Sequence, residues 1–475
     1  MKDKEITVTA DELQKQKLYT ADVAAIMQVR AMHGTPKALV RTYGCQQNVA
    51  DGERIKGMLS EMGFEFTEDE DEADFILFNT CAIREHAEDR VFGNIGALKN
   101  VKRRNPSLLI AVCGCMMEQE RVAERIKASF PFVNIVFGTH VIHRLPEMMY
   151  TAVTDSKRVF LRGHESKEII EGLPVRRDGN TRAWVTVMYG CDNFCSYCIV
   201  PYVRGRERSR ASARIIEEAR ELKAEGVKEI MLLGQNVNSY RAGEVGFPEL
   251  IRRVADVSPL LRVRFATSHP KDMSDGLLEV MASMPNVCRA IHLPAQSGAT
   301  SMLGRMNRKY TREWYLDRIA AIRRYLPDCA ITTDLIAGFS GETEEEHLQT
   351  LSLMREVGYD FAYMFKYSER PGTFAEKHLG DDVPEEVKSR RLSEIIALQN
   401  ELGHASNLRD VGREFEVLVE GESKRDRNQL SGRTSQNKVV VFDRGYHRVG
   451  DYVRVRITGC TPATLFGDVI SGPCN

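Results

Sequence analysis

The chain has 475 residues, of which 43% are hydrophobic and 28% are charged. These values are typical of globular proteins and exclude a wholly disordered chain, and no run approaches the roughly 18 apolar residues of a membrane helix. The net charge of −1 leaves a polyanionic partner open, because such partners bind local patches. The opening MKDKEITVTADELQKQ lacks the apolar core of a secretory signal. We therefore expect a cytoplasmic protein without a membrane anchor.

The first part of the chain has the pattern of an α/β domain. Residues 1–36 are an amphipathic, partly helical lead-in, and from 37 to 150 short apolar runs alternate with helical periods. Strands are expected at 38–43, 75–78, 108–112 and 134–137, and helices at 51–62, 85–102 and 118–129. This alternation predicts a doubly wound parallel sheet.

A second domain is predicted after a linker at 151–180. From 181 to 408 a new strand–helix alternation runs along the chain and ends in a helix-rich segment. Its strands are expected at 183–189, 229–234, 262–267, 289–293, 330–338 and 360–367. Six strands in this length predict a partial (β/α)6 barrel rather than a closed eight-stranded one.

The last segment, 409–475, has a different pattern. The stretches REFEVLVEGES, NKVVVFD and DYVRVRIT alternate apolar and polar residues, with glycine-rich turns between them. This pattern predicts a small antiparallel β-barrel as the third domain.

The cysteines carry the first functional signal. Their number, eleven, is odd, and a chain of this length needs no disulfide framework, so clustered cysteines point to metal ligands or catalytic groups. GCDNFCSYC at 190–198 directly follows the first predicted barrel strand and places Cys191, Cys195 and Cys198 in a CxxxCxxC spacing. Three thiolates can bind a [4Fe–4S] cluster and leave one iron open, whereas an electron carrier would use four. A structural zinc site is the alternative; it needs a fourth ligand, such as Cys288 or Cys329, and usually shows paired CxxC knuckles.

This triplet resembles the radical S-adenosylmethionine (SAM) superfamily. The resemblance implies that SAM binds the open iron and that one electron from the cluster cleaves it to a 5′-deoxyadenosyl radical. It also places Gln235 and Asn236, in GQNVNSY, where the superfamily holds the methionine end of SAM. Ser268, Gln296 and Asp334 are expected at or just beyond carboxyl ends of barrel strands, at the same mouth. Loop or cap structure is the alternative for each of these polar residues.

Three more cysteines are predicted to meet in the first domain. Cys45, Cys81 and Cys115 each follow a predicted strand. Because parallel strands end at the same sheet edge, where open α/β sheets bind ligands, their thiols are expected to meet there and hold a second cluster with an open iron. The alternatives are three unrelated buried cysteines, or Cys113 in place of Cys115.

Together these motifs resemble the methylthiotransferase family. The resemblance rests on YGCQQN, NTCAIREHAEDRVFG, CGCM and GCDNFCSYCIVPYVRGRERSR, spans the chain from about residue 37, and includes a C-terminal barrel like a TRAM domain. Ala82, Ile83 and Arg84 resemble the MiaB-type branch, which acts on dimethylallyl-adenosine next to the anticodon of tRNA. The family resemblance implies two [4Fe–4S] clusters and two uses of SAM. One SAM molecule methylates the cluster-bound sulfur, and the other supplies the radical. We count these three residues among the candidate substrate-binding residues.

Basic residues are the remaining candidates for substrate binding. Arginines alternate in VRGRERSR, where they can contact phosphates or a flipped base, or form internal salt bridges at a helix entry. A second basic group lies in the C-terminal barrel. Because small barrels often bind nucleic acid, we count this group among the candidates as well. The two groups are Arg204, Arg206, Arg208 and Arg210, and Lys424, Arg425 and Arg427 with Arg433 and Lys438.

These features predict a methylthio transfer to carbon 2 of dimethylallyl-adenosine in tRNA, by radical SAM chemistry with a second cluster carrying the sulfur. No side chain is assigned as a catalytic group itself. The expected partners are tRNA with an isopentenylated adenosine, a flavodoxin- or ferredoxin-like electron donor and a sulfur donor, and the chain is expected to be a monomer. The alternatives are a methylthiotransferase acting on threonylcarbamoyl-adenosine or on a ribosomal protein, and a non-catalytic iron–sulfur electron carrier with an RNA-binding barrel.

Overall fold

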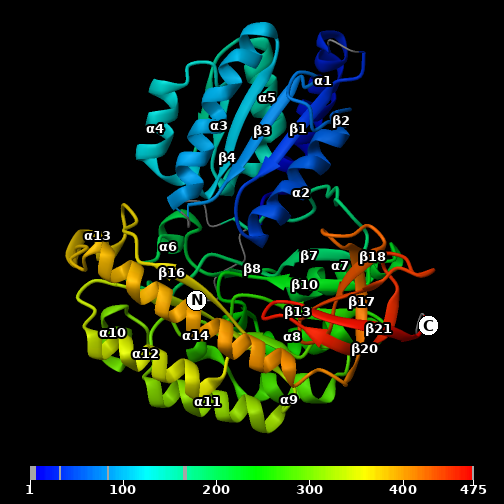
Figure 1. The fold of residues 1–475 in the computed structure, drawn as a ribbon. Coiled ribbons are helices and arrows are strands. Elements are labelled where there is room, and N and C mark those ends of the chain that lie inside the picture. Colours follow the sequence, from blue (N-terminus) through cyan, green and yellow to red (C-terminus); the bar gives the residue numbers. More distant parts are fainter. Residues whose placement is uncertain (1–6, 32–33, 83–84, 164–167, 473–475) are drawn as a thin grey trace. The chain divides into compact units, whose positions relative to one another are not determined.

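The computed structural model describes residues 7–31, 34–82, 85–163 and 168–472 (Figure 1). The chain forms two compact units. The N-terminal unit consists of Met1–Asp178, Tyr189–Asp192 and Cys198–Arg208, and the C-terminal unit consists of Gly179–Met188, Asn193–Tyr197 and Ser209–Asn475. The cysteine triplet loop therefore contributes residues to both units.

A six-stranded parallel sheet forms the centre of the N-terminal unit and confirms the doubly wound prediction. Its order is β2-β1-β3-β4-β5-β6. The strands are β1 (Lys37–Thr42), β2 (Glu65–Phe66), β3 (Phe75–Thr80), β4 (Leu109–Gly114), β5 (Ile135–Phe137) and β6 (Val159–Leu161). The linker prediction is wrong at β6, which pairs with β5 as an edge strand. β6 has only three residues, all half-buried, and so short a run does not show the alternation of apolar and polar residues that predicts a strand.

Helices cover both faces of this sheet, so its central strands β3 and β4 are buried throughout and contain the apolar runs FILF and LIAV. Phe75 and Leu77 pack with α1, α2 and α5, while Ile76 and Phe78 pack with α3 and α4. The lead-in therefore includes a helix, α1, that contributes to the core. The helical elements are α1 (Ala10–Arg30), α2 (Gln46–Glu61), α3 (Glu85–Arg104), η1 (Cys115–Glu118), α4 (Glu120–Ser129), η2 (Thr139–Arg144), α5 (Leu145–Thr154) and α6 (Val200–Val203).

The six predicted barrel strands are all present in the C-terminal unit. They pair in parallel as β7-β10-β13 and β14-β15-β16, and a parallel bridge from Val263 to Val287 links the two groups. The strands are β7 (Arg182–Thr186), β10 (Glu229–Leu233), β13 (Arg262–Phe265), β14 (Ala290–His292), β15 (Ala330–Ala337) and β16 (Phe361–Lys366). The partial barrel is thus confirmed.

Helices and short elements connect these strands. The helices are α7 (Ser212–Ala224), α8 (Phe247–Ala255), α9 (Asp275–Ser283), α10 (Thr300–Arg305), α11 (Arg312–Tyr325), α12 (Glu344–Val357), α13 (Phe374–His378) and α14 (Glu385–Leu408). The short elements are β8 (Met188–Tyr189), β9 (Arg208–Ser209), η3 (Val237–Ser239), β11 (Arg241–Ala242), β12 (Val245–Gly246) and η4 (Pro270–Asp272).

The C-terminal segment closes into a five-stranded barrel in the order β17-β18-β19-β21-β20. The strands are β17 (Glu414–Glu422), β18 (Gln429–Arg433), β19 (Val439–Asp443), β20 (Tyr452–Cys460) and β21 (Leu465–Ser471). Alternate apolar side chains fill its interior. The small barrel is as predicted, but the β19–β21 pairing is parallel, because β20 and β21 form a hairpin whose second strand closes the barrel.

Buried charges join this small barrel to the partial barrel. Arg262 and Arg264 project from β13, and their guanidinium groups donate to backbone oxygens of Arg433 at 2.8 Å and Thr434 at 2.6 Å. Arg264 also pairs at 2.7 Å with the fully buried carboxylate of Glu229. The two barrels of the C-terminal unit are therefore tied by side-chain to backbone hydrogen bonds.

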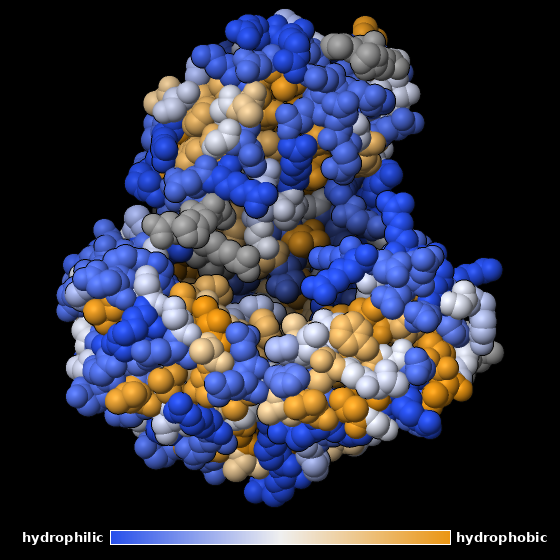
Figure 2. Space-filling view, in the orientation of Figure 1, coloured by the Kyte–Doolittle hydropathy of each residue, from blue (hydrophilic) through white to orange (hydrophobic). Residues whose placement is uncertain are grey.

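On the face drawn in Figure 2, hydrophobic residues are scattered among hydrophilic ones. Among the described residues, no helix combines the length and apolar character required to cross a membrane.

Candidate active site

The three N-terminal cysteines lie at the carboxyl edge of the parallel sheet, as predicted. Cys45 is the residue before α2, Cys81 follows the last residue of β3, and Cys115 follows the last residue of β4. The thiols of Cys45 and Cys81 share a hydrogen bond. Cys81 and Cys115 are buried, and Cys45 is half-buried.

Cys113 differs from Cys115 in where it lies. Cys113 is inside β4, in register with Asn79, and packs in the apolar core under the sheet. Cys115 instead packs with Ala82, next to Cys81. Burial raises the pKa of both thiols, to about 11 for Cys115. The position at the edge favours Cys115 over Cys113 as the third member of the cluster of thiols.

A buried ion pair holds Cys115. The Arg204 guanidinium donates from Nε to the Cys115 Sγ at 2.9 Å and from Nη1 to the Asp51 Oδ2 at 2.8 Å. Both charged side chains are buried, and the Arg204 Nη2 has no hydrogen-bond partner among the described residues. The prediction that Arg204 contacts tRNA phosphates does not suit this position, because its charge faces the cysteines and not the solvent.

The charge of Arg204 also acts on Cys45. The hydrogen bond with Cys81 and the nearby positive charge of Arg204 both lower the pKa of Cys45 and outweigh the effect of burial, so that the pKa is about 6. Thiolate sulfur is the form that ligates metals. The edge of this sheet therefore combines three thiols with a fixed positive charge that offsets the negative charge of thiolates.

This donor set has the chemistry of an iron–sulfur site. Within the described residues, no group of three His, Cys, Asp or Glu side chains is found that could hold one metal ion. The three thiols at this edge are buried or half-buried, and thiolates are the ligands that iron–sulfur clusters use. The buried Nη2 of Arg204 is a donor of the kind that satisfies cluster sulfur.

The triplet loop begins with a strained turn. Gly190 has φ +72°, and a Cβ there would lie 2.0 Å from the backbone oxygen of Arg206. The Cys191 N–H donates to the Gly205 oxygen at 3.1 Å. The glycine therefore allows the loop that carries Cys191 to run directly along the segment after Cys198.

Gly190→Ala is expected to lose the iron of the triplet while the N-terminal sheet stays folded, because the alanine combines left-handed backbone strain, about 1–3 kcal/mol, with a backbone collision. Iron content and circular dichroism of the full chain measure the two effects. Gly93→Ala is the matched control, since a Cβ at Gly93 meets no atom within 4 Å. Equal iron in both variants would contradict this account of the turn.

The segment after Cys198 packs on the N-terminal cysteines. Ile199 and Val203 form one apolar cluster with Ala82 and Cys115 within the N-terminal unit. Ala82 is thus buried beside the thiols, whereas the predicted residues Ile83 and Arg84 lie outside the described residues.

The other predicted arginines have different surroundings. Arg206 is exposed and pairs with Asp192 at 2.6 Å. The Arg208 guanidinium donates to the Arg204 backbone oxygen at 3.2 Å. Arg210 is buried, and its guanidinium binds the Thr186 oxygen at 2.6 Å and Glu218 at 2.9 Å. Arg210 thus forms an internal salt bridge of the kind that was the alternative for this group of arginines.

An arginine that the sequence analysis missed holds Cys195. The buried Arg308 donates to the Cys195 Sγ at 3.4 Å and to the Pro294 oxygen at 2.7 Å. Phe194, just before Cys195, has φ +47°, and its oxygen accepts from the Asn307 side chain at 2.7 Å. Cys115 and Cys195 thus each contact a buried guanidinium, and no sequence spacing announces either contact.

Four of the predicted SAM-binding residues lie in loops just beyond strand ends: Gln235, Asn236, Ser268 and Gln296. Asp334 instead lies inside β15, so the prediction that it stands at a strand end is wrong. Gln235 is half-buried. The Oδ1 of Asn236 and the Oγ of Ser268 are buried and have no hydrogen-bond partner among the described residues. Gln296 has φ +68°, and its N–H donates to the Asp334 oxygen at 2.8 Å. Because buried polar atoms are normally paired, Asn236 and Ser268 are available to a ligand.

The barrel's predicted basic group divides in two. Lys424, Arg425 and Arg427 are exposed in the loop between β17 and β18. Lys438 instead binds Asp410 at 2.6 Å and the Ser406 hydroxyl at 2.8 Å within the chain.

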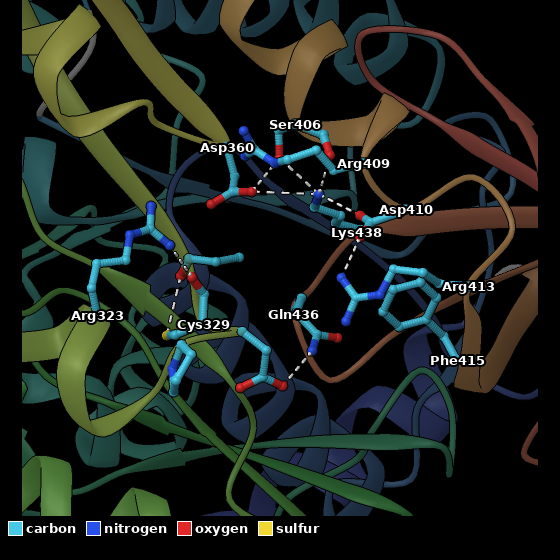
Figure 3. A pocket seen from close by; sticks show the side chains of 13 residues that line it. Arg323, Cys329, Asp360, Ser406, Arg409, Asp410, Arg413, Phe415, Gln436 and Lys438 are labelled. Atoms are coloured by element: carbon cyan, nitrogen blue, oxygen red, sulfur yellow. Dashed lines mark hydrogen bonds and ion pairs between the residues drawn. The ribbon is translucent and has the colours of Figure 1, made fainter.

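Lys438 lines a polar cavity of about 250 Å³ (Figure 3). The cavity lies where β15 and β16 begin, beside Ala330 and Asp360. Barrel enzymes place their active sites at the opposite, carboxyl ends of the strands. Figure 3 shows the surrounding side chains bound to one another, including Arg413 with Asp410. The Gln436 side chain donates to the Asp328 carboxylate at 3.2 Å. The cavity therefore belongs to the joint between the barrels, and not to the active site.

Three family models match the chain. A model described as "Uncharacterized protein family UPF0004" matches residues 37–138, the Radical SAM superfamily matches residues 185–354, and the TRAM domain matches residues 408–470. Among solved structures, the chain is similar to the radical S-adenosylmethionine methyltransferase TsrM from Kitasatospora setae with cobalamin and a [4Fe-4S] cluster bound. That similarity has a TM-score of 0.53 at 13% identity over 74% of this chain and 80% of that one, which shows a shared fold.

Curated relatives cover nearly the whole chain. The chain is 53% identical over 445 residues to the tRNA-2-methylthio-N(6)-dimethylallyladenosine synthase of Phocaeicola vulgatus. The matched region covers 91% of this chain and 96% of the relative. It is 52% identical over 443 residues to the enzyme of the same name from Bacteroides thetaiotaomicron, with the same coverage. The chain belongs to the tRNA-2-methylthio-N(6)-dimethylallyladenosine synthase family and is a radical SAM transferase.

Proposed function

We propose that this chain transfers a methylthio group to carbon 2 of dimethylallyl-adenosine next to the anticodon of tRNA, in the cytoplasm. The observation that supports it most is the meeting of Cys45, Cys81 and Cys115 at one sheet edge beside a buried arginine. Carbon 2 of adenine carries no acidic proton and no leaving group, so general acid–base catalysis, worth about 10²–10⁴-fold, does not suffice there.

Two [4Fe–4S] clusters and SAM are the proposed cofactors. Cys45, Cys81 and Cys115 ligate one cluster, and Cys191, Cys195 and Cys198 ligate the other. When bound, these groups supply the radical and the sulfur that the reaction requires.

The chain's own residues bind and orient these groups. Arg204 and Arg308 donate to one cysteine of each set, which offsets thiolate charge and fixes the sulfur positions. The buried polar atoms of Asn236 and Ser268 bind SAM. Gln235, Gln296 and Asp334 are the further candidates for contacts with SAM. Such positioning matters because a displacement of about 1 Å can cost 10²-fold in rate.

The proposed macromolecular partner is tRNA. The exposed loop residues Lys424, Arg425 and Arg427 and the exposed Arg206 suit contacts with its phosphates. A flavodoxin- or ferredoxin-like protein would supply electrons, a separate donor would restore sulfur, and a single chain would carry out the reaction.

The test is nucleoside mass spectrometry. The reconstituted full chain is incubated with SAM, a reductant and isopentenylated tRNA, and the digested tRNA is searched for methylthio-adenosine. We expect methylthio-dimethylallyl-adenosine from this substrate, and no product from tRNA with threonylcarbamoyl-adenosine or from ribosomal protein. Product only from one of the latter would identify a different acceptor, and cleavage of SAM without any methylthio product would refute the proposal.

A further inference from the structure

Three aromatic side chains form an exposed row on β16, a strand at the edge of its sheet. Phe361, Tyr363 and Phe365 are 42%, 48% and 42% exposed, and the residue between the first two, Ala362, is fully buried. Phe361 and Tyr363 have ring centroids 5.0 Å apart. Because side chains alternate along a strand, the three rings share one face, which none of the functional assignments above uses.

Polar residues of neighbouring strands lie on the same face. Phe361, Tyr363 and Phe365 are in register with Thr332, Asp334 and Ile336 of β15. The centroid of the His292 ring, on β14, lies 5.7 Å from that of the Tyr363 ring. The His292 Nε2 lies 3.5 Å from the Asp334 carboxylate. The row therefore adjoins Asp334, one of the residues proposed to lie beside SAM.

The opposite face of β16 is covered. Ala362 belongs to the apolar core that includes Ile395 and Leu398 of α14, and the Gln399 side chain of that helix donates to the Tyr359 oxygen. The aromatic row thus lies on the inner face of the partial barrel, where about half of each ring is open to solvent.

We propose that Phe361, Tyr363 and Phe365 form the surface on which the target adenine stacks and against which its dimethylallyl chain packs. This inference rests on the proposed function and assigns specificity residues to it. Purines of unpaired RNA stack on aromatic side chains, and sheets with exposed aromatic rows bind RNA bases in this way. The five-carbon dimethylallyl chain would add binding free energy, because packing against the same rings removes its apolar surface from water.

The same face disfavours the threonylcarbamoyl group. That substituent carries a carboxylate, which would lose hydration against aromatic rings and meet the like charge of Asp334, in register with Tyr363. The row therefore selects an apolar substituent on adenine over an anionic one.

Leucine substitutions test the row. Phe361→Leu, Tyr363→Leu and Phe365→Leu keep an apolar side chain but remove the ring. For each, kcat and KM are measured with isopentenylated tRNA and with tRNA carrying unmodified adenosine, together with formation of 5′-deoxyadenosine without tRNA. The matched control is Phe374→Leu, an aromatic residue of similar exposure on α13.

Each ring removed is expected to lower kcat/KM for isopentenylated tRNA by about 5- to 150-fold, the equivalent of about 1–3 kcal/mol for stacking one base. Most of the loss should come from a higher KM, and the preference for isopentenylated over unmodified tRNA should become smaller. The rate of 5′-deoxyadenosine formation without tRNA and the melting temperature should match those of the wild type. Losses no larger than that of Phe374→Leu, or a preference that stays unchanged, would overturn the inference. If wild type itself forms no methylthio product, the failure lies with the proposed function and not with the row.

Discussion

Replacing Cys45, Cys81 and Cys115 together by alanine is expected to abolish methylthio transfer while the chain still cleaves SAM. The three thiols come from three separate loops of the N-terminal sheet, whereas Cys195 is held independently by Arg308 in the C-terminal unit. Iron and sulfide should fall to half the wild-type content after reconstitution, with 5′-deoxyadenosine formation retained. Metal analysis and nucleoside mass spectrometry of the same preparation measure both effects.

Cys113→Ala is the control for this experiment. Cys113 is buried in the sheet core only two residues from Cys115, so its loss tests the effect of removing a nearby thiol. Full iron content and activity are expected from it, apart from a modest loss of stability. Half the iron in Cys113→Ala, with full iron in a single Cys115→Ala variant, would show that the third ligand was assigned to the wrong cysteine.

Breaking the buried pair of Asp51 and Arg204 should give the largest loss of stability. Asp51→Ala leaves a buried guanidinium without its carboxylate, and removing one partner of a buried ion pair costs about 3–5 kcal/mol. Urea denaturation of the full chain measures the loss. Asp192→Ala is the matched control, because its partner Arg206 is mostly exposed and such a pair contributes about 0–1 kcal/mol.

A double variant separates charge from packing. Asp51→Leu combined with Arg204→Met replaces both charges by apolar side chains, a change that is often neutral for stability. It should recover most of the stability lost in Asp51→Ala but not the iron at the N-terminal cysteines, since the donor to Cys115 is gone. A loss in Asp51→Ala no greater than in Asp192→Ala would mean that this pair does not stabilise the unit.

Much of the fold could be predicted because its strands are distinct apolar runs. FILF and LLIAV became β3 and β4, and all six barrel strands lie where their runs predicted them. The edge strands β2 and β6 escaped prediction, since they have two and three residues and are not fully buried. The parallel β19–β21 pairing escaped it as well, because alternation along a strand does not reveal the direction of its neighbour.

The candidate site was predictable where topology alone brings residues together. Cys45, Cys81 and Cys115 follow from the shared direction of parallel strands. The contact of Arg204 with Asp51 joins residues 153 positions apart, and that of Arg308 with Cys195 joins residues 113 apart, so no local pattern encodes either one. The aromatic row did have a signal, the alternation in DFAYMFKY, but a barrel strand is normally covered on both faces.

The arginines of β13 limit how the C-terminal barrel can be removed or replaced by another domain. Arg262 and Arg264 donate to backbone oxygens that only that barrel supplies, while Glu229 remains buried between charged neighbours. Truncation after α14 would remove the backbone acceptors of Arg262 and Arg264, while Arg264 would keep its pair with Glu229. The C-terminal barrel therefore contributes to the structure of the partial barrel, and a foreign domain could replace it only by presenting oxygens at the same places.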